Sequence, residues 1–333
     1  MKKTIGLAYD LKTDYVFKPN DPPDANAEFD HPSTVNLIAD TIESLGYKVV
    51  KIGNVLKLLK KFDNLKVDMV FNISEGLYGR NRESQVPIIL ELAKVPFVGS
   101  DGLTLGLSLD KVMTKKILIS EGIPTPKFFE TDDPTDNLAK IKELKFPMIV
   151  KPRYEGSSKG LSEKSRVADI EQLRGQVDYI IKAYKQSALV EEFISGSEYT
   201  VAIIGNDNPQ VFPPVQIRID GSSRLGNKFY TFARIHSDRL EYACSDKMDS
   251  GLKDKLMELA LQTYKAIDCR DFGRVDFRVD EHNKPYVLEI NPLPSLSSED
   301  VFMCLAKYLD VPYSDMIRRI LEAAFTRNGL NKE

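Results

Sequence analysis

Apolar and polar residues alternate in two neighbouring segments near the end of the chain, and this pattern predicts a β-hairpin. The segments cover residues 273–280 and 286–292, and a short polar segment connects them. Alternation with a period of two is typical of strands that bury one face. Glu289 and Asn291 are two residues apart, so their side chains point to the same face of the second strand.

Short apolar runs alternate with helical periods through the first hundred residues. This alternation predicts an α/β fold that begins with an open parallel sheet. Two polar segments, residues 10–32 and 74–84, are predicted to be loops. The predicted strands cover residues 4–9, 48–52, 67–73 and 96–99, and the predicted helices lie near residues 35–45, 55–62 and 88–92.

The rest of the chain continues to mix helices and strands. One helix is predicted over residues 108–120, because a glycine and two prolines follow it. Further helices are predicted near residues 250–267 and 313–325. The predicted strands cover residues 146–152, 188–194 and 198–204, and more strands are expected within residues 211–243.

Composition limits the classes of function. Apolar residues make up 42% of the 333 residues, which favours a globular protein with a sizeable core. The formal net charge of -3 gives no electrostatic reason to expect nucleic acid or an anionic membrane as the main partner. The three cysteines are isolated, and the sequence has no apolar leader or spanning run, so we expect a cytoplasmic protein.

Oxygen ligands converge in the predicted hairpin. Asp276 on the first strand and Glu289 and Asn291 on the second carry the carboxylate and amide oxygens that Mg²⁺ prefers. Arg274 would add a positive charge for phosphate. The alternative is an edge hairpin whose acids are solvated. We favour the magnesium site, because hydrated carboxylates rarely lie within runs as apolar as residues 287–291.

A glycine- and serine-rich loop, residues 155–160, follows the predicted strand that carries Lys151. Such a loop offers backbone N–H groups and hydroxyls to phosphate oxygens, and its glycines permit a close approach. The sequence contains no Walker A pattern and no GxGxxG after the first strand. Lys111, at a predicted helix start, would reach the same phosphates. The alternatives are an ordinary surface loop and a solvated lysine.

An acidic strand–turn–strand segment comes next. Glu191, Glu192, Phe193 and Ile194 lie at the end of one strand, and Glu198 begins the following one. An adenine nucleotide needs a backbone donor and acceptor, apolar groups above and below the base, and an acid for the ribose hydroxyls. This segment supplies all of these. The alternative is a pair of exposed acids on an edge strand.

Together and in this order, these motifs resemble the ATP-grasp superfamily, and most closely the D-alanine–D-alanine ligase family. The resemblance implies an N-terminal α/β domain over residues 1–102 and a two-part ATP-grasp fold. Its central part, residues 103–193, would carry the phosphate-covering loop, and its C-terminal part, residues 194–333, the magnesium site. The resemblance is strongest in residues 109–111, 149–158, 190–198 and 273–294.

The resemblance also implies roles for individual residues. Arg274, Lys151 and Ser295 would be catalytic, and Ser295 stands where the family has a glycine whose backbone N–H helps to form the oxyanion site. ATP and two Mg²⁺ ions are the implied cofactors. Asp276, Glu289 and Asn291 would bind the metal. The residues implied to contact ATP are Lys111, Lys151, Glu155, Gly156, Ser157, Ser158, Glu191, Glu192, Phe193, Ile194, Glu198 and Arg234.

The resemblance fails in the substrate pocket. Asp300 stands at the position of the serine that holds the carboxylate of the second D-alanine in the family. A carboxylate there would repel the carboxylate of an amino acid and would suit an amine or another cation. In the mobile loop, Arg234 matches a lysine, Ile235 replaces a tyrosine, and His236 is either a base or a solvated histidine.

The region that matches the family's first-substrate site also differs. A His-Gly pair is expected after the third strand, but the chain has Glu75 and Gly76. We take Glu75 and Arg80 as candidate pocket residues. Other charged residues here are Arg82 and Glu83, and Glu28 or Asp30 could substitute for an acidic residue that the family has near its first strand.

The implied reaction joins a carboxylate to an amine through an acylphosphate and converts ATP to ADP and phosphate. Because of Asp300 and the lost histidine, we predict small-molecule acid and amine substrates, such as amino acids, other than a pair of D-alanines. One alternative is D-alanine–D-alanine ligase with a rearranged pocket. Another is a non-catalytic ATP-binding regulator, against which the intact Arg274 and metal ligands argue. The resemblance also implies a homodimer.

Overall fold

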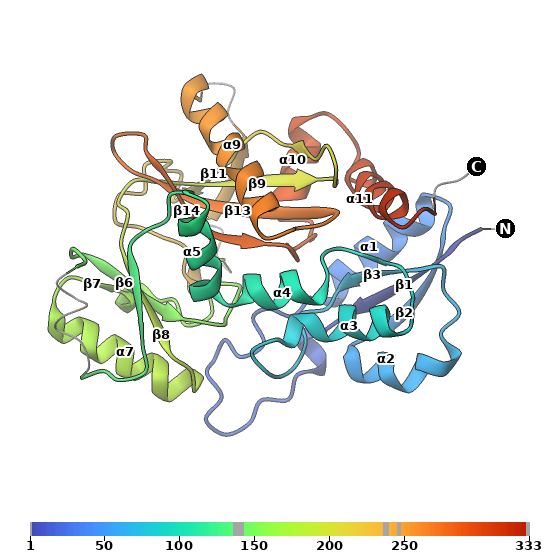
Figure 1. Cartoon of the computed structure of the whole chain (residues 1–333), viewed down its shortest axis with the longest axis horizontal. Helices are drawn as coiled ribbons and strands as arrows, with labels where there is room; N and C mark the ends of the chain where they lie inside the picture. Colours follow the sequence, from blue (N-terminus) through green and yellow to red (C-terminus); the bar gives the residue numbers. More distant parts are fainter. Residues whose placement is uncertain (1, 136–142, 236–239, 245–247, 331–333) are drawn as a thin grey trace.

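Three β-sheets follow one another along the chain in the computed structural model of the protein (Figure 1). The structure describes residues 2–135, 143–235, 240–244 and 248–330. In the view of Figure 1, the N-terminal sheet lies at the right, the second sheet along the chain at the left, and the third and largest sheet above and between them. The mixed α/β fold that the sequence predicts is confirmed.

The N-terminal sheet is parallel, with the strand order β2-β1-β3-β4, as the alternation of strands and helices predicts. All five residues of its third strand are buried, because helices cover both faces. The strands are β1 (Thr4–Tyr9), β2 (Lys48–Gly53), β3 (Met69–Ile73) and β4 (Phe97–Val98), and the helices are α1 (Pro32–Ser44), α2 (Val55–Lys61) and α3 (Gln85–Leu92).

The second sheet along the chain has the strand order β5-β8-β6-β7, and one long helix packs on it. Sequence reasoning missed β5 and this helix, α7. The signal for α7 was present, since apolar residues recur at helical spacing after the capping residue Asp169. The elements are β5 (Phe128–Thr131), β6 (Met148–Pro152), β7 (Arg166–Val167), α7 (Ile170–Tyr184) and β8 (Ala188–Glu192).

The largest sheet contains the predicted hairpin. Its order is β12-β11-β9-β13-β14, with β10 paired to β9. The short helices α8 and α10 were not expected from the sequence. The elements are β9 (Ser197–Ile204), β10 (Gln210–Val211), β11 (Val215–Ile219), α8 (Phe232–Ile235), β12 (Leu240–Cys244), α9 (Ser250–Ala266), β13 (Phe272–Val279), β14 (Pro285–Asn291), α10 (Val301–Tyr308) and α11 (Tyr313–Arg327).

Strand β9 shows how the period of two builds the core of this sheet. Tyr199, Val201 and Ile203 pack on the side of α9. Ala202 and Ile204 point the other way, into a core that α10 and α11 share with the N-terminal sheet. The largest sheet is therefore covered on both faces, and it is joined to the N-terminal sheet through a common hydrophobic core.

The predicted helix over residues 108–120 is wrong at its start. The chain forms two helices, α4 (Gly102–Leu109) and α5 (Lys111–Ser120), with Asp110 in an extended conformation between them. Asp110 accepts a hydrogen bond from the backbone N–H of Met113 at 3.2 Å and two from the Arg153 guanidinium at 2.7 and 2.6 Å. An aspartate in this position ends one helix and caps the next. The break places Lys111 on the first turn of α5.

No helix in the described part of the chain is both long and apolar enough to cross a membrane.

Candidate active site

A cavity of about 770 Å³ lies where the three sheets meet, and it collects nearly all the predicted site residues. Its wall includes the predicted phosphate loop (the phosphate loop, residues 155–160), the ends of β6 and β8, and the hairpin β13–β14. Arg80 and Arg234, both within the described ranges, are not part of this wall. The predicted residues that line it are Glu75, Lys111, Lys151, Glu155, Gly156, Ser157, Ser158, Glu191, Glu192, Phe193, Ile194, Glu198, Arg274, Asp276, Glu289, Asn291, Ser295 and Asp300.

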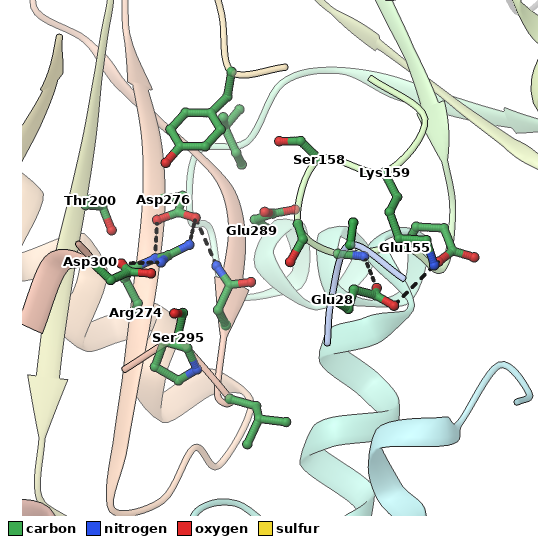
Figure 2. A pocket seen from close by; sticks show the side chains of 18 of the residues that line it. Glu28, Glu155, Ser158, Lys159, Thr200, Arg274, Asp276, Glu289, Ser295 and Asp300 are labelled. Atoms are coloured by element: carbon green, nitrogen blue, oxygen red, sulfur yellow. Dashed lines mark hydrogen bonds and ion pairs between the residues drawn. The ribbon is translucent and has the colours of Figure 1, made fainter. Parts of the chain in front are cut away.

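The hairpin brings the candidate magnesium ligands together. Asp276 pairs with Glu289 across β13 and β14, as the alternation predicts. The Arg274 guanidinium donates to both oxygens of Asp276, with Nε–Oδ1 and Nη2–Oδ2 distances of 3.0 and 3.1 Å, and the side-chain amide of Asn291 donates at 2.9 Å (Figure 2). Burial raises the pKa of Asp276, while Arg274 lowers it and Glu289 raises it further. Two acids thus share one face, with one arginine beside them.

Two lysines place positive charge beside Glu289. The Lys111 ammonium lies 3.3 Å from its carboxylate and donates to the carbonyl of Glu155 at 2.6 Å. Although burial raises the pKa of Glu289, Lys111 and Lys151 lower it to about 2. Glu289 is therefore ionised at neutral pH. Both lysines face the cavity at the place where the sequence predicts phosphate.

A second buried lysine was missed. Lys115 is fully buried and forms an ion pair with Glu191, whose other oxygen lies 2.7 Å from the Lys151 ammonium. Burial lowers the pKa of Lys115 to about 8, although Glu191 raises it. Lys115 follows Lys111 by one helical turn, so spacing along α5 could have shown that both point to the same side. Glu191 consequently pairs with two buried cations.

The other residues of the predicted adenine segment have partners within the protein. The Glu192 carboxylate accepts from the backbone N–H of Lys145 at 2.9 Å. Phe193 packs edge-on against Phe229, with 5.7 Å between ring centroids. Glu198 is buried, and its carboxylate lies 3.1 Å from the Arg278 guanidinium. The segment offers the cavity an aromatic ring and a paired acid, and their contact with a nucleotide remains a prediction.

The long loop after β1 holds the phosphate loop in place. Glu28 accepts hydrogen bonds from the backbone N–H of Gly156 at 2.5 Å and from Arg82 at 2.6 Å, and Lys159 lies 3.2 Å away (Figure 2). Arg82 and Lys159 lower the pKa of Glu28 to about 2 although burial raises it. Asp24 accepts from the backbone N–H of Gly160 at 2.8 Å. The sequence indicated Glu28 only as a substitute for an acidic residue that the family has near its first strand. It did not predict that Glu28 and Asp24 would bind the backbone of the phosphate loop.

Tyr184→Phe tests the second of these anchors. The Tyr184 hydroxyl donates to Asp24, with oxygen distances of 2.8 and 2.9 Å. Hydrogen bonds to charged groups stabilise by about 1.5–3 kcal/mol, so the variant should lose about 1–3 kcal/mol of unfolding free energy in urea denaturation. Tyr78→Phe is the control, because Tyr78 is exposed and its hydroxyl makes no hydrogen bond within the described residues. Equal stability of the two variants would contradict the anchor.

Asp300 and two tyrosines form the cavity wall next to Arg274. The Asp300 carboxylate caps α10 by accepting from the backbone N–H of Val301 at 2.6 Å and lies 3.4 Å from the Arg274 guanidinium. The hydroxyls of Tyr230 and Tyr242 are hydrogen-bonded to each other. Burial raises the pKa of Tyr242, and the charge of Asp300 raises it further. Both tyrosines line the cavity and were missed, because no local sequence pattern brings Tyr230 and Tyr242 together at its wall.

Two other residues named from the sequence, Arg80 and Arg234, are not among the described residues that line the cavity. Arg80 is exposed and stacks over Tyr154, so its neighbour Arg82 is the buried arginine of this segment. The Arg234 guanidinium lies 2.5 Å from Glu163, just beyond the phosphate loop. His236 lies outside the described residues. The positive charge expected from Arg80 in the pocket is thus supplied by Arg82, which is turned toward Glu28.

Among the described residues, no group of three or more histidine, cysteine, aspartate or glutamate side chains is placed to hold a metal. The candidate magnesium set has two carboxylates and one amide. A site for Mg²⁺ in this hairpin would therefore need further oxygens, which phosphate and water supply in nucleotide sites.

Comparison with known proteins gives the family. The family described as "D-ala D-ala ligase C-terminus" matches residues 117–322, more than half of the chain. A D-alanine–D-alanine ligase of Carboxydothermus hydrogenoformans is 35% identical over 287 residues, which are 83% of this chain and 87% of that protein. The chain belongs to the D-alanine–D-alanine ligase family. An uncharacterized protein, y4sG, of Sinorhizobium fredii is 37% identical over 265 residues, or 79% of this chain and 77% of its own length.

Solved structures agree with the observed architecture. The D-alanine–D-alanine ligase from Bacillus anthracis complexed with ATP aligns with a TM-score of 0.77 and 24% identity, over 98% of this chain and 99% of that one. At this identity the match shows the ATP-grasp fold. The protein is an ATP-dependent ligase of the type that forms carbon–nitrogen bonds, as the sequence predicts.

Proposed function

We propose that this ligase joins a small carboxylic acid to an amine and that its product is not D-alanyl-D-alanine. Asp300 carries the proposal. Its carboxylate caps the start of α10 and pairs with Arg274. A helix N-terminus and an arginine are the groups that would attract a substrate carboxylate. Because Asp300 already binds both, a second carboxylate would meet a negative charge there.

The proposed reaction has two steps. An oxygen of the acid attacks the γ-phosphorus of ATP, and ADP leaves. The amine then attacks the acyl carbon of the acylphosphate, loses a proton, and displaces phosphate. Lys111, Lys151 and Arg274 would offset the negative charge that builds on the transferring phosphoryl group, and the backbone N–H of Ser295 would donate to the oxyanion. The docked phosphate loop would keep water from the acylphosphate.

We further propose that Asp276, Glu289 and Asn291 bind Mg²⁺, with two ions present when ATP is bound. These side chains fit the ion, because they are oxygen donors on adjacent strands and the Glu289 charge raises the pKa of Asp276. The metal would neutralise phosphate charge.

The proposed domains are residues 1–102, 103–193 and 194–333. A homodimer formed through the first domain is also proposed. The three cysteines, Cys244, Cys269 and Cys304, form no disulfide within the described residues, which supports a cytoplasmic location.

A coupled ADP-release assay over panels of acids and amines tests this function. The proposal expects ADP release with an acid and an amine together, and little release with D-alanine as the sole organic substrate. Efficient release with D-alanine alone would overturn it. That outcome would favour the second candidate, D-alanine–D-alanine ligase, which the names of relatives such as the Carboxydothermus enzyme support.

Asp300→Ser should open the amine site to amino acids. Serine also caps helix N-termini, so the start of α10 is kept while the negative charge is removed. The expected result is a rise of about tenfold or more in kcat/KM for amine substrates that carry a carboxylate, since removing the charge lifts a repulsion of about 1–4 kcal/mol. Asp300→Asn should behave alike. Unchanged discrimination against carboxylates in both variants would show that Asp300 does not select the amine.

A further inference from the structure

The cavity has an acidic end, whose two carboxylates form no ion pair with a lysine or arginine of the described residues. Glu75 and Glu83 both line it, and Glu83 is only 8% exposed. Within the described residues, neither carboxylate makes a hydrogen bond or an ion pair. Burial raises the pKa of Glu83 to about 7 and that of Glu75 well above its ordinary value. The positive charge of Arg82 lowers both pKa values, and the negative charge of Glu28 raises both.

The backbone holds these two acids in place. Asp10, at the end of β1, accepts from the Ser74 hydroxyl at 2.5 Å and from the backbone N–H of Gly76 at 2.9 Å, on either side of Glu75. Gly76 has a φ of +80°, and a Cβ there would lie 2.3 Å from the carbonyl oxygen of Arg82. Only glycine permits this approach. The turn of Glu75 is thereby packed against the turn of Glu83.

The nearby cations are already paired. Arg82 binds Glu28 at 2.6 Å and lies 3.3 Å from Glu155. Lys159 pairs with the same two acids, and Lys111 with Glu289. A buried carboxylate without a partner costs free energy unless it is protonated or meets a cation. A ligand is therefore the remaining source of positive charge for this end of the cavity.

We propose that the acid substrate of this ligase has a cationic side chain, and that Glu75 and Glu83 bind it. This inference rests on the proposed ligase function. The acidic end adjoins the phosphate loop, since Arg82, the residue before Glu83, lies 3.3 Å from Glu155 of that loop. The acid that accepts the phosphoryl group must also lie beside the loop. The ammonium group of an amino acid balances one carboxylate, and a cationic side chain balances the second. Basic amino acids, with an ammonium or guanidinium side chain, are the substrate class.

Hydroxylamine trapping tests the acid specificity without knowledge of the amine. An acylphosphate reacts with hydroxylamine to give a hydroxamate and phosphate, so each acid can be assayed with ATP and Mg²⁺ alone. Lysine is compared with norleucine and arginine with citrulline, in both enantiomers, because each pair differs mainly in side-chain charge. We expect kcat/KM for the charged member to be about 10- to 100-fold higher, the range for hydrogen bonds to charged groups.

Substitutions assign this preference to the two glutamates. Glu83→Gln and Glu75→Gln keep the side-chain size and remove the charge, and each should reduce the lysine-to-norleucine ratio about tenfold or more. Glu91→Gln is the matched control, because Glu91 is exposed on α3. It should keep the ratio of the unmodified enzyme. Melting temperature and ATP binding show whether each variant is folded.

The pH dependence gives a readout that a structural role would not change. Lysine should bind the ionised form of Glu83, so its KM should rise as pH falls through about 7, where this carboxyl becomes protonated. In Glu83→Gln this rise should flatten. The charged groups that face Glu83 and Glu75 are Glu28, Asp30, Arg82, Lys111 and Glu155.

The outcomes separate the two proposals. Hydroxamate from norleucine or citrulline at rates equal to lysine and arginine would overturn the cationic side chain and leave the ligase function intact. If no acid yields hydroxamate, calorimetry with lysine and norleucine, in the presence of Mg²⁺ and a non-hydrolysable ATP analogue, decides. Selective lysine binding there would support the Glu75–Glu83 site while the ligase proposal fails, and equal or absent binding would overturn both.

Discussion

Arg274→Ala is expected to lower kcat by about 10³-fold or more, the range found when an arginine that stabilises transferring phosphoryl charge is removed. In the structure this guanidinium holds both oxygens of Asp276 and also contacts Asp300. Its acidic neighbours raise its pKa, although burial lowers it, so it stays charged at any working pH. The measurement is initial-rate ADP release with the best acid and amine of the screen.

Two further variants show whether the loss belongs to the chemical step. Arg274→Lys keeps a charge but cannot bind Asp276 with two parallel hydrogen bonds, so it should retain only a small part of the rate. Arg318→Ala removes an arginine that is half exposed on α11 and should keep full activity. ATP affinity should change much less than kcat in Arg274→Ala. A kcat within tenfold of the unmodified enzyme would remove Arg274 from the proposed mechanism.

Glu191→Ala is expected to lower the free energy of unfolding by about 3–5 kcal/mol, the usual cost of removing one partner from a buried ion pair. Glu191 and Lys115 are each 1% exposed or less, and Lys151 pairs with the same carboxylate. Without Glu191, the buried ammonium groups of Lys115 and Lys151 would repel each other with no carboxylate between them. Urea denaturation followed by far-ultraviolet circular dichroism measures the change.

An exposed ion pair provides the comparison. Asp178 and Lys182 form a pair one turn apart on the outside of α7, and Asp178→Ala should cost no more than about 1 kcal/mol. Adding Lys115→Met to Glu191→Ala removes one of the two unpaired cations and should recover part of the stability. A Glu191→Ala protein as stable as the Asp178→Ala protein would mean that water reaches these lysines and that the network is not buried in solution.

The chain itself determined the parts of the site that local pattern can encode. The period of two around Asp276 and Glu289 fixes which side chains share a face, and the structure confirms that they are paired. Strand and helix alternation predicted the parallel sheet, and the order of the motifs predicted the family. The sequence of the missed helix α7 contains a capping residue and apolar residues at helical spacing, so this helix could have been predicted from the sequence.

Only the tertiary structure decided which charged residues enter the cavity. Glu28 and Gly156 are 128 residues apart, and no local rule joins them. Arg80 and Arg82 are two residues apart, yet Arg80 is exposed and Arg82 is buried, where it pairs with Glu28. Period and propensity act over a few residues, whereas ion pairs and desolvation depend on what the fold brings near. The sequence thus predicted the phosphate chemistry, and packing between the three sheets formed the acidic end of the cavity, where we propose that the substrate is recognised.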